Sequence, residues 1–125
     1  MSDFVVPPEA VSAQHRSSNP AGSVWVSANA GAGKTYVLAE RVVRLLLDGV
    51  EPGAILCLTY TNAAAAEMAG RVFKRLAGLA FLPEDALLEE VARLAPQVPA
   101  EAAATRARTL FARTLETPGG IKVQT

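Results

Sequence analysis

The sequence predicts an α/β fold in which a parallel sheet is flanked by helices. VWVSA at residues 24–28 and AILCLTY at 54–60 are apolar runs without polar alternation, as expected of strands that are covered on both faces. Each run precedes a segment with helical spacing of apolar residues, and alternating strands and helices are typical of a parallel sheet. A third strand is expected in the last five residues, IKVQT, after the turn Pro-Gly-Gly.

Helical periodicity accounts for most of the remaining chain. Helices are expected over four segments with apolar residues at helical spacing: residues 34–48, 61–77, 87–94 and 107–115. Gly49 suits the end of the first helix, and Thr61 can cap the start of the second. Residues 1–22 predict at most a short helix around EAVSAQHR, followed by a loop.

Composition fits one soluble domain. The chain has 125 residues, of which half are hydrophobic and 19% are charged. Twelve basic residues balance twelve acidic residues, so no overall charge indicates nucleic acid or a membrane, and any DNA contact must be local. The amino terminus lacks the pattern of a secretory signal, and no run approaches the roughly 18 apolar residues of a membrane span. A single cysteine, Cys57, excludes an internal disulfide, and a cytoplasmic location is expected.

The stretch ANAGAGKT at residues 28–35 is typical of a phosphate-binding loop. The P-loop pattern is glycine, four residues, then glycine, lysine and serine or threonine, and this sequence departs from it only at Ala28. Lys34 is expected to reach the β- and γ-phosphates and Thr35 to ligate Mg²⁺, so both are assigned catalytic roles. The alternative is an ordinary glycine turn before a helix. The predicted nucleotide site consists of Ala28, Asn29, Ala30, Gly31, Ala32, Gly33, Lys34 and Thr35.

A second motif, LTYTNAAAAEMAGRV at residues 58–72, points to a family. Together with ANAGAGKT it resembles the first motifs of superfamily 1 DNA helicases of the UvrD/Rep type. In these helicases a strand ends in a Thr-aromatic-Thr-Asn turn and leads into an Ala-rich helix. More narrowly, residues 14–125 resemble the start of AddA-type helicase-nuclease subunits, which act in double-strand break repair. The similar segments are WVSANAGAGKT, RLLLDGVEP, ILCLTYTNAAAAEM and LFARTLETPGGIKVQT.

The resemblance implies an incomplete P-loop NTPase domain of the RecA-like class that binds ATP and Mg²⁺. It also implies that a glutamine upstream of the loop contacts adenine, and Gln14 stands twenty residues before Lys34. A glutamine amide can both donate and accept hydrogen bonds, which suits the adenine edge. Without the resemblance, Gln14 would be interpreted as a solvated residue in a polar leader.

The resemblance further implies that Thr59, Tyr60, Thr61 and Asn62 contact single-stranded DNA. An aromatic ring can stack on a base, and hydroxyl, amide and helix-start N–H groups can hold a phosphate without reading sequence. The alternative is that Tyr60 closes a strand and Thr61 only caps a helix. Ala63 stands where many relatives have lysine, so one DNA contact of the family is absent.

Other charged residues are interpreted as surface residues. Glu67 stands four positions before Arg71, the spacing that favours an exposed ion pair on a helix. Arg75 and Glu90 are assigned to solvated helix faces. Asp48 is rejected as a metal-holding acid, because it belongs to the helix that begins at the P-loop and not to the tip of a neighbouring strand.

Four parts are expected along the chain. Residues 1–22 form a leader with the possible adenine-contacting glutamine, and residues 23–78 begin the RecA-like ATP-binding lobe. Residues 79–117 form a helical insertion, and residues 118–125 are a third strand on which the chain ends within a motif.

Implications for the whole protein come from the resemblance. The Asp-Glu motif, the arginine fingers, the second lobe and the nuclease domain of the family follow after the point that Thr125 reaches. The implied partners are DNA ends and an AddB-like partner subunit, with no membrane. The 125 residues alone are expected to lack helicase, nuclease and efficient ATPase activity. Two alternatives remain: a small self-contained P-loop nucleotide-binding or regulatory protein without motor activity, and a chain that does not fold stably by itself.

Overall fold

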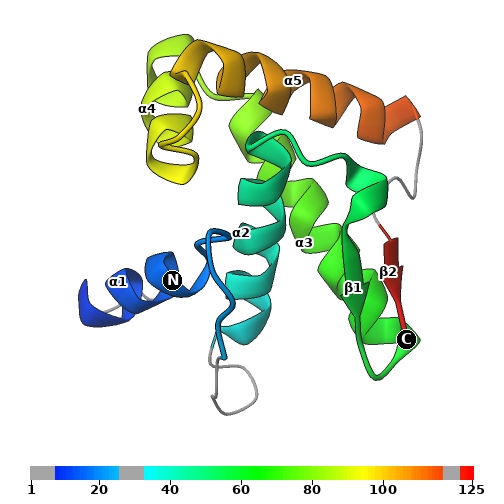
Figure 1. The fold of residues 1–125 in the computed structure, drawn as a ribbon. Helices are drawn as coiled ribbons and strands as arrows, with labels where there is room; N and C mark the ends of the chain where they lie inside the picture. Colours follow the sequence, from blue (N-terminus) through cyan, green and yellow to red (C-terminus); the bar gives the residue numbers. More distant parts are fainter. Residues whose placement is uncertain (1–7, 26–32, 117–121) are drawn as a thin grey trace, which may run out of the picture.

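The computed structural model describes residues 8–25, 33–116 and 122–125, and the helices and strands below are those of these residues (Figure 1). In chain order they are α1 (Pro8–Ser17), α2 (Lys34–Leu47), the 3-10 turn η1 (Pro52–Ala54), β1 (Leu56–Leu58), α3 (Asn62–Ala80), α4 (Glu84–Leu94), α5 (Ala100–Glu116) and β2 (Lys122–Gln124). The four helices expected from periodicity are present, each within a few residues of its expected start, except that the last begins at Ala100, earlier than expected.

The predicted fold class is wrong for the described residues. They are mainly helical, and no parallel sheet flanked by helices is formed among them. Two short strands, β1 and β2, pair in parallel over three residue pairs, from Leu56 with Lys122 to Leu58 with Gln124. Of the expected strand at 24–28, Val24 and Trp25 are exposed and belong to no strand, and the rest lies outside the described residues.

The run at 54–60 also differs from its prediction. It was expected to be covered on both faces, but Leu58 is 70% exposed and Leu56 is exposed as well. Ile55 is buried and Cys57 packs partly buried against the helical core. Only one face of β1 therefore contributes to the interior, because the hydrophobic core is built between helices and not against a sheet.

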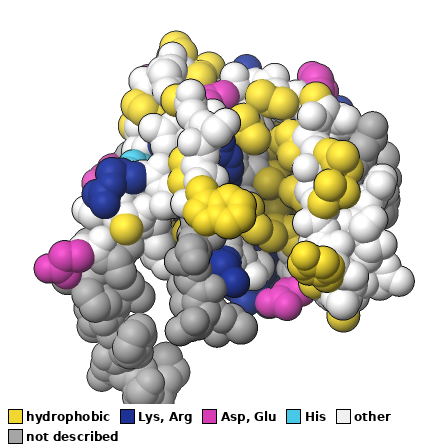
Figure 2. Space-filling model, turned by 60° about the horizontal axis from the view of Figure 1, so that its bottom comes forward, with side chains coloured by type: hydrophobic (Ala, Val, Ile, Leu, Met, Phe, Trp, Pro, Cys, Tyr) yellow, Lys and Arg dark blue, Asp and Glu magenta, His cyan; other side chains and the backbone are white. Residues whose placement is uncertain are grey.

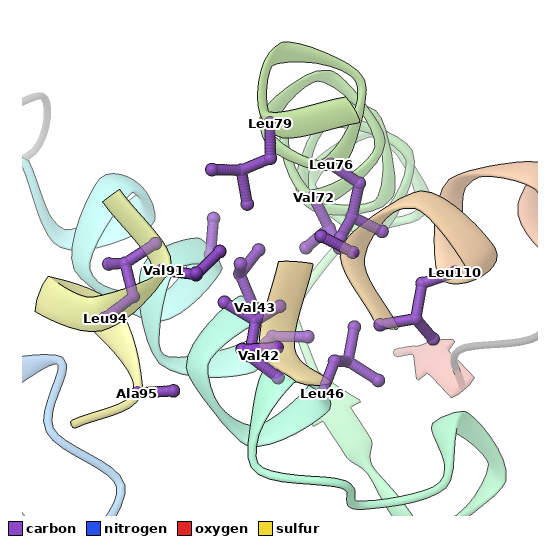
Figure 3. Packing of buried hydrophobic residues seen from close by; sticks show 14 of the residues in the cluster. Val42, Val43, Leu46, Val72, Leu76, Leu79, Val91, Leu94, Ala95 and Leu110 are labelled. Carbon is purple, nitrogen blue, oxygen red and sulfur yellow. The ribbon is translucent and has the colours of Figure 1, made fainter. Parts of the chain in front are cut away.

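The core lies where α2, α3, α4 and α5 meet (Figure 3). On α3, Val72, Leu76 and Leu79 follow one another at helical spacing and all are buried. α5 presents small side chains to this core, which lets its backbone approach its neighbours closely. The fully buried side chains include Val43, Leu46, Leu47, Leu87, Val91, Leu94, Ala103 and Ala107.

Local residue choice explains where the helices begin and end. Gly33 precedes α2 with φ of 93°, a left-handed conformation that glycine adopts without a Cβ penalty. At the other end of α2, Arg106 of α5 donates a hydrogen bond from Nη1 to the carbonyl of Leu47 at 2.6 Å. Thr61 caps α3, because its side-chain oxygen accepts from the N–H of Ala64 at 3.0 Å.

Some large hydrophobic side chains remain on the surface. They include Trp25, Leu58 and Phe81. Figure 2 shows hydrophobic side chains gathered around a hollow on the face that lies at the bottom in Figure 1. Within the described residues, no helix combines the length and the apolar character needed to cross a membrane.

Replacing a core leucine of α2 should destabilise the protein far more than replacing an exposed one. Leu46 is 1% exposed and Leu38, on the same helix, is 52% exposed. We expect Leu46→Ala to lower the free energy of unfolding by about 2–5 kcal/mol, because it leaves a cavity. The matched change Leu38→Ala should cost about 0.5 kcal/mol. Urea denaturation followed by circular dichroism measures both, and equal losses would contradict the described packing.

Two glycines should respond to alanine with opposite signs. We expect Gly33→Ala to lower the free energy of unfolding by about 1–2 kcal/mol, because an L-residue is disfavoured in the left-handed conformation that starts α2. Gly70 lies in the interior of α3, and nothing stands within 4 Å of the position of an added Cβ. Gly70→Ala should therefore stabilise by about 0.5–1 kcal/mol. Thermal unfolding of the two variants compares the signs directly.

Candidate functional site

The described part of the P-loop forms the start of α2. Ala28, Asn29, Ala30, Gly31 and Ala32 lie outside the described residues, whereas Gly33, Lys34 and Thr35 lie within them. Lys34 is exposed and Thr35 is half-buried. The first turn of α2 holds no acidic residue. Its unpaired N–H groups and the positive end of the helix dipole therefore act together with the Lys34 ammonium, an arrangement that favours an anion.

Gln14 lies against this helix start. It belongs to α1, and its amide nitrogen stands 2.7 Å from the position that a Cβ on Gly33 would occupy. Any side chain at position 33 would therefore force the Gln14 amide to move. The structure brings Gln14 and the last glycine of the P-loop into contact, although nineteen residues separate them in the sequence.

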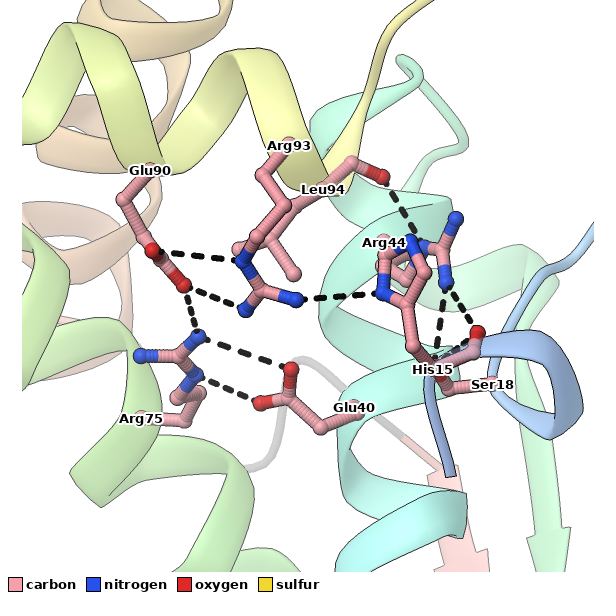
Figure 4. A network of polar contacts seen from close by, with 8 residues as sticks. All are labelled: His15, Ser18, Glu40, Arg44, Arg75, Glu90, Arg93 and Leu94. Carbon is pink, nitrogen blue, oxygen red and sulfur yellow. Dashed lines mark hydrogen bonds and ion pairs between the residues drawn. The ribbon is translucent and has the colours of Figure 1, made fainter. Parts of the chain in front are cut away.

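Two arginines of α2 hold α1 and the segment after it. Arg41 donates from Nη1 to the carbonyl of Asn19 at 3.0 Å and to that of Ser17 at 3.4 Å, and from Nη2 to the carbonyl of Gly22. Arg44 donates from Nη1 to the carbonyl of His15 at 2.8 Å and from Nε to that of Leu94 at 2.9 Å. Its guanidinium also donates to the Ser18 hydroxyl at 3.0 Å (Figure 4).

A chain of charged side chains continues from α2 to α3 and α4 (Figure 4). Glu40 is only 3% exposed and pairs with Arg75, which also donates to Glu90 at 2.7 Å. Glu90 in turn accepts from Arg93. The interpretation of Arg75 and Glu90 as solvated surface residues is therefore wrong, since each side chain is partly enclosed between helices by its ion-pair partners.

The electrostatics of this chain follow from its partners. The hydrogen bond from Arg93 lowers the pKa of Glu90 against the opposing effect of burial. Burial, followed by the positive charges of Arg44 and Arg93, lowers the pKa of His15. Arg93 approaches His15 Nδ1 at 3.1 Å, and because arginine only donates, this nitrogen must be the acceptor of a neutral ring. His15 therefore stays uncharged and links α4 to α1.

The predicted DNA-contacting turn lies between β1 and α3. Thr61 uses its side-chain oxygen to cap α3, and the Thr59 hydroxyl donates to the carbonyl of Thr61 at 3.0 Å. The N–H of Thr59 donates to the carbonyl of Gln124 at 2.8 Å. Tyr60 is fully exposed and Asn62 is exposed at the first turn of α3. Thr61 thus has the capping role of the alternative interpretation, whereas Tyr60 does not pack onto the core.

The start of α2 and the start of α3 face the same end of the molecule, the lower end in Figure 1. Asp48 caps the opposite end of α2, far along the helix from Lys34. A pocket of about 470 Å³ also lies at that opposite end, between the segment after α2 and α5, and is lined by Leu46, Gly49 and Arg106 among others. It is therefore distinct from the predicted nucleotide site.

Metal-ligating side chains do not cluster in the part of the chain that the structure describes. Within residues 8–25, 33–116 and 122–125, no group of three or more His, Cys, Asp or Glu is placed to hold a metal ion. Thr35 is the P-loop residue with a hydroxyl that suits Mg²⁺. The pair Glu67 and Arg71 forms the exposed ion pair expected from its spacing, at 3.1 Å.

Sequence reasoning missed Glu40, Arg41 and Arg44. A signal for one of them was present: Arg44 interrupts the apolar run VVRLLL, and it is 2% exposed in the structure. A charge inside an apolar helical run requires partners from other elements. The sequence does not indicate that these partners are backbone carbonyls at the ends of two other helices.

Comparisons with known proteins agree with the motifs. Residues 10–115 match the family of the UvrD/REP helicase N-terminal domain. An ATP-dependent helicase/nuclease of Pelotomaculum thermopropionicum, of the AddA type, is 44% identical over 77 residues, which are 58% of this chain and 6% of the relative. Its counterpart from Desulforudis audaxviator is 49% identical over 79 residues, 60% of this chain and 6% of the relative. That of Heliobacterium modesticaldum is 51% identical over 49 residues, 39% of this chain and 4% of the relative.

No solved structure matches this chain. The chain spans only 4–6% of the length of these curated relatives. The family match, in contrast, covers most of the chain and includes both sequence motifs, the P-loop and the Thr-Tyr-Thr-Asn turn. This chain belongs to the family of the UvrD/REP helicase N-terminal domain.

Proposed function

We propose that this chain is the amino-terminal part of an AddA-type, ATP-dependent DNA helicase/nuclease and that it binds ATP with Mg²⁺ at the start of α2. The observation that carries the proposal is the contact between Gln14 and Gly33 beside Lys34. An amide suited to an adenine edge and a helix start suited to phosphates thereby lie next to each other. The names of the relatives support the class of enzyme.

Each residue has a distinct task in this proposal. Lys34 neutralises the β- and γ-phosphates, and the N–H groups at the start of α2 hold phosphate oxygens. Thr35 supplies one oxygen ligand to Mg²⁺, which offsets the charge of the triphosphate when bound. Gln14 contacts the base. Because the described residues contain no acidic cluster beside Thr35, hydrolysis needs groups from elsewhere, and the chain alone is proposed to bind ATP without efficient turnover.

The turn Thr59 to Asn62 is proposed to contact single-stranded DNA. Tyr60 offers a ring with both faces open for stacking on a base, and the first turn of α3 offers N–H groups for a phosphate. In the proposed division, residues 23–78 carry the nucleotide and DNA segments, and residues 79–117 are a helical insertion. The proposed partners of the whole protein are DNA ends and a second, AddB-like protein, in the cytoplasm.

Nucleotide binding by the 125-residue chain should depend on Lys34. We expect MgATP to raise the thermal unfolding midpoint of the wild type, because a ligand that binds only the folded form stabilises it. Lys34→Ala should weaken ATP binding about 10- to 100-fold, the effect of one lost charge-assisted hydrogen bond. Calorimetric titration at a temperature below unfolding gives the affinities.

The matched control is Lys74→Ala, which removes an exposed lysine from α3. This variant should bind MgATP as the wild type does. No midpoint shift of the wild type at saturating MgATP, or an unchanged affinity in Lys34→Ala, would contradict the proposed site.

Single-stranded DNA binding should depend on the Tyr60 ring. We expect Tyr60→Ala to weaken binding of a fluorescent oligothymidine by about 1–3 kcal/mol, the contribution of one stacked base. Fluorescence anisotropy at fixed salt measures this loss. Phe81→Ala removes another highly exposed aromatic ring, at the far end of α3, and should leave the anisotropy titration unchanged. Equal effects of the two substitutions would count against a specific role of the turn.

A further inference from the structure

We propose that Arg41 and Arg44 are positioning residues that make the nucleotide site selective for adenine, because they hold Gln14 against Gly33. This inference rests on the proposed function. We call these two arginines the α1 clamp. Neither is part of the P-loop motif, and both lie on α2 within three turns of Lys34.

The clamp acts on α1 through the backbone. Arg41 donates to the carbonyls of Ser17, Asn19 and Gly22, which fixes the last residue of α1 and the segment after it onto α2. Three carbonyls on one guanidinium define both its distance and its direction, since the five N–H donors of arginine have a fixed planar arrangement. The position of α1 along α2 is thereby set.

Arg44 fixes the same helix from its own last turn. It donates to the carbonyl of His15, the residue next to Gln14, and to the Ser18 hydroxyl. Its Nε bond to the carbonyl of Leu94 ties the end of α4 to the same guanidinium. Carbonyls in the last turn of a helix lack intrahelical partners, so Arg44 satisfies the ends of α1 and α4 together (Figure 4).

The two halves of the site depend on the clamp to different extents. Lys34 and Thr35 belong to α2 itself, so their geometry does not pass through Arg41 or Arg44. Gln14 belongs to α1, whose attachment to α2 consists largely of these arginine contacts. Loss of the clamp should therefore release the contact to the base and leave the contact to the phosphates in place.

The test compares two ligands on the full 125-residue chain: MgATP and magnesium tripolyphosphate, which lacks adenosine. In the wild type, ATP should bind more tightly than tripolyphosphate. We expect Arg41→Met to weaken ATP binding about five- to tenfold, as for the loss of one well-placed hydrogen bond. Tripolyphosphate affinity should change less than about twofold in the same variant. Calorimetry is carried out below the unfolding transition, where a general loss of stability has no effect on affinity.

The matched control is Arg71→Met, which makes the same change on α3 and breaks only the exposed pair with Glu67. It should alter neither affinity. Arg44→Lys is the second variant, because it keeps the buried charge and cannot reach all of the Arg44 acceptors; it should also weaken ATP selectively. Adding Gln14→Ala to Arg41→Met should give no further loss, since the base contact is already released.

The outcomes separate the two proposals. If the wild type binds neither ligand, or Lys34→Ala binds both as the wild type does, the proposed function fails and the clamp with it. If the wild type prefers ATP but Arg41→Met and Arg44→Lys both keep that preference, or weaken both ligands equally, the clamp proposal is overturned and the nucleotide site stands. Additive losses in the double variant would also overturn it.

Discussion

Two buried charges of opposite sign on α2, Glu40 and Arg44, constrain how α1, α3 and α4 are placed. They lie one turn apart and are 3% and 2% exposed. An unpaired buried charge costs several kcal/mol, so each must meet its partners before α2 can be covered. Glu40 takes a guanidinium from α3, and Arg44 takes carbonyls from α1 and α4. The helix that starts at the P-loop is therefore the element to which the others are fitted.

The apolar and polar contacts make different contributions to this arrangement. Burial of Val43, Leu46 and their neighbours supplies most of the driving force, but hydrophobic contacts have little directional preference. The arginine contacts have defined directions and lengths. Where the helices pack is thus set by the apolar faces, and the angle and register of α1 on α2 are set by hydrogen bonds. A site made from two helices needs the second kind of contact, because the ligand senses their relative position.

The sequence was sufficient for the helices and for the motif of the site. The spacing of Val72, Leu76 and their neighbours predicts α3, and GKT locates the start of α2. It was misleading for the sheet, because the run AILCLTY indicates burial without indicating what provides it, and the helices bury only one face of β1. Arg41 and Arg44 were not predicted, since their acceptors are backbone carbonyls, which every sequence possesses and no residue pattern marks.

The same property of the clamp bears on how the chain tolerates change. Most of what Arg41 and Arg44 hold is main chain: the carbonyls of residues 15, 17, 19 and 22 on the side of α1. Every residue type offers this acceptor, so the exposed side chains of that segment are free to diverge while the attachment persists. The two arginines have no such freedom, because no other side chain offers five donors in a plane. The leader of this protein is thus anchored by a device whose sequence requirement lies almost entirely on the opposite helix.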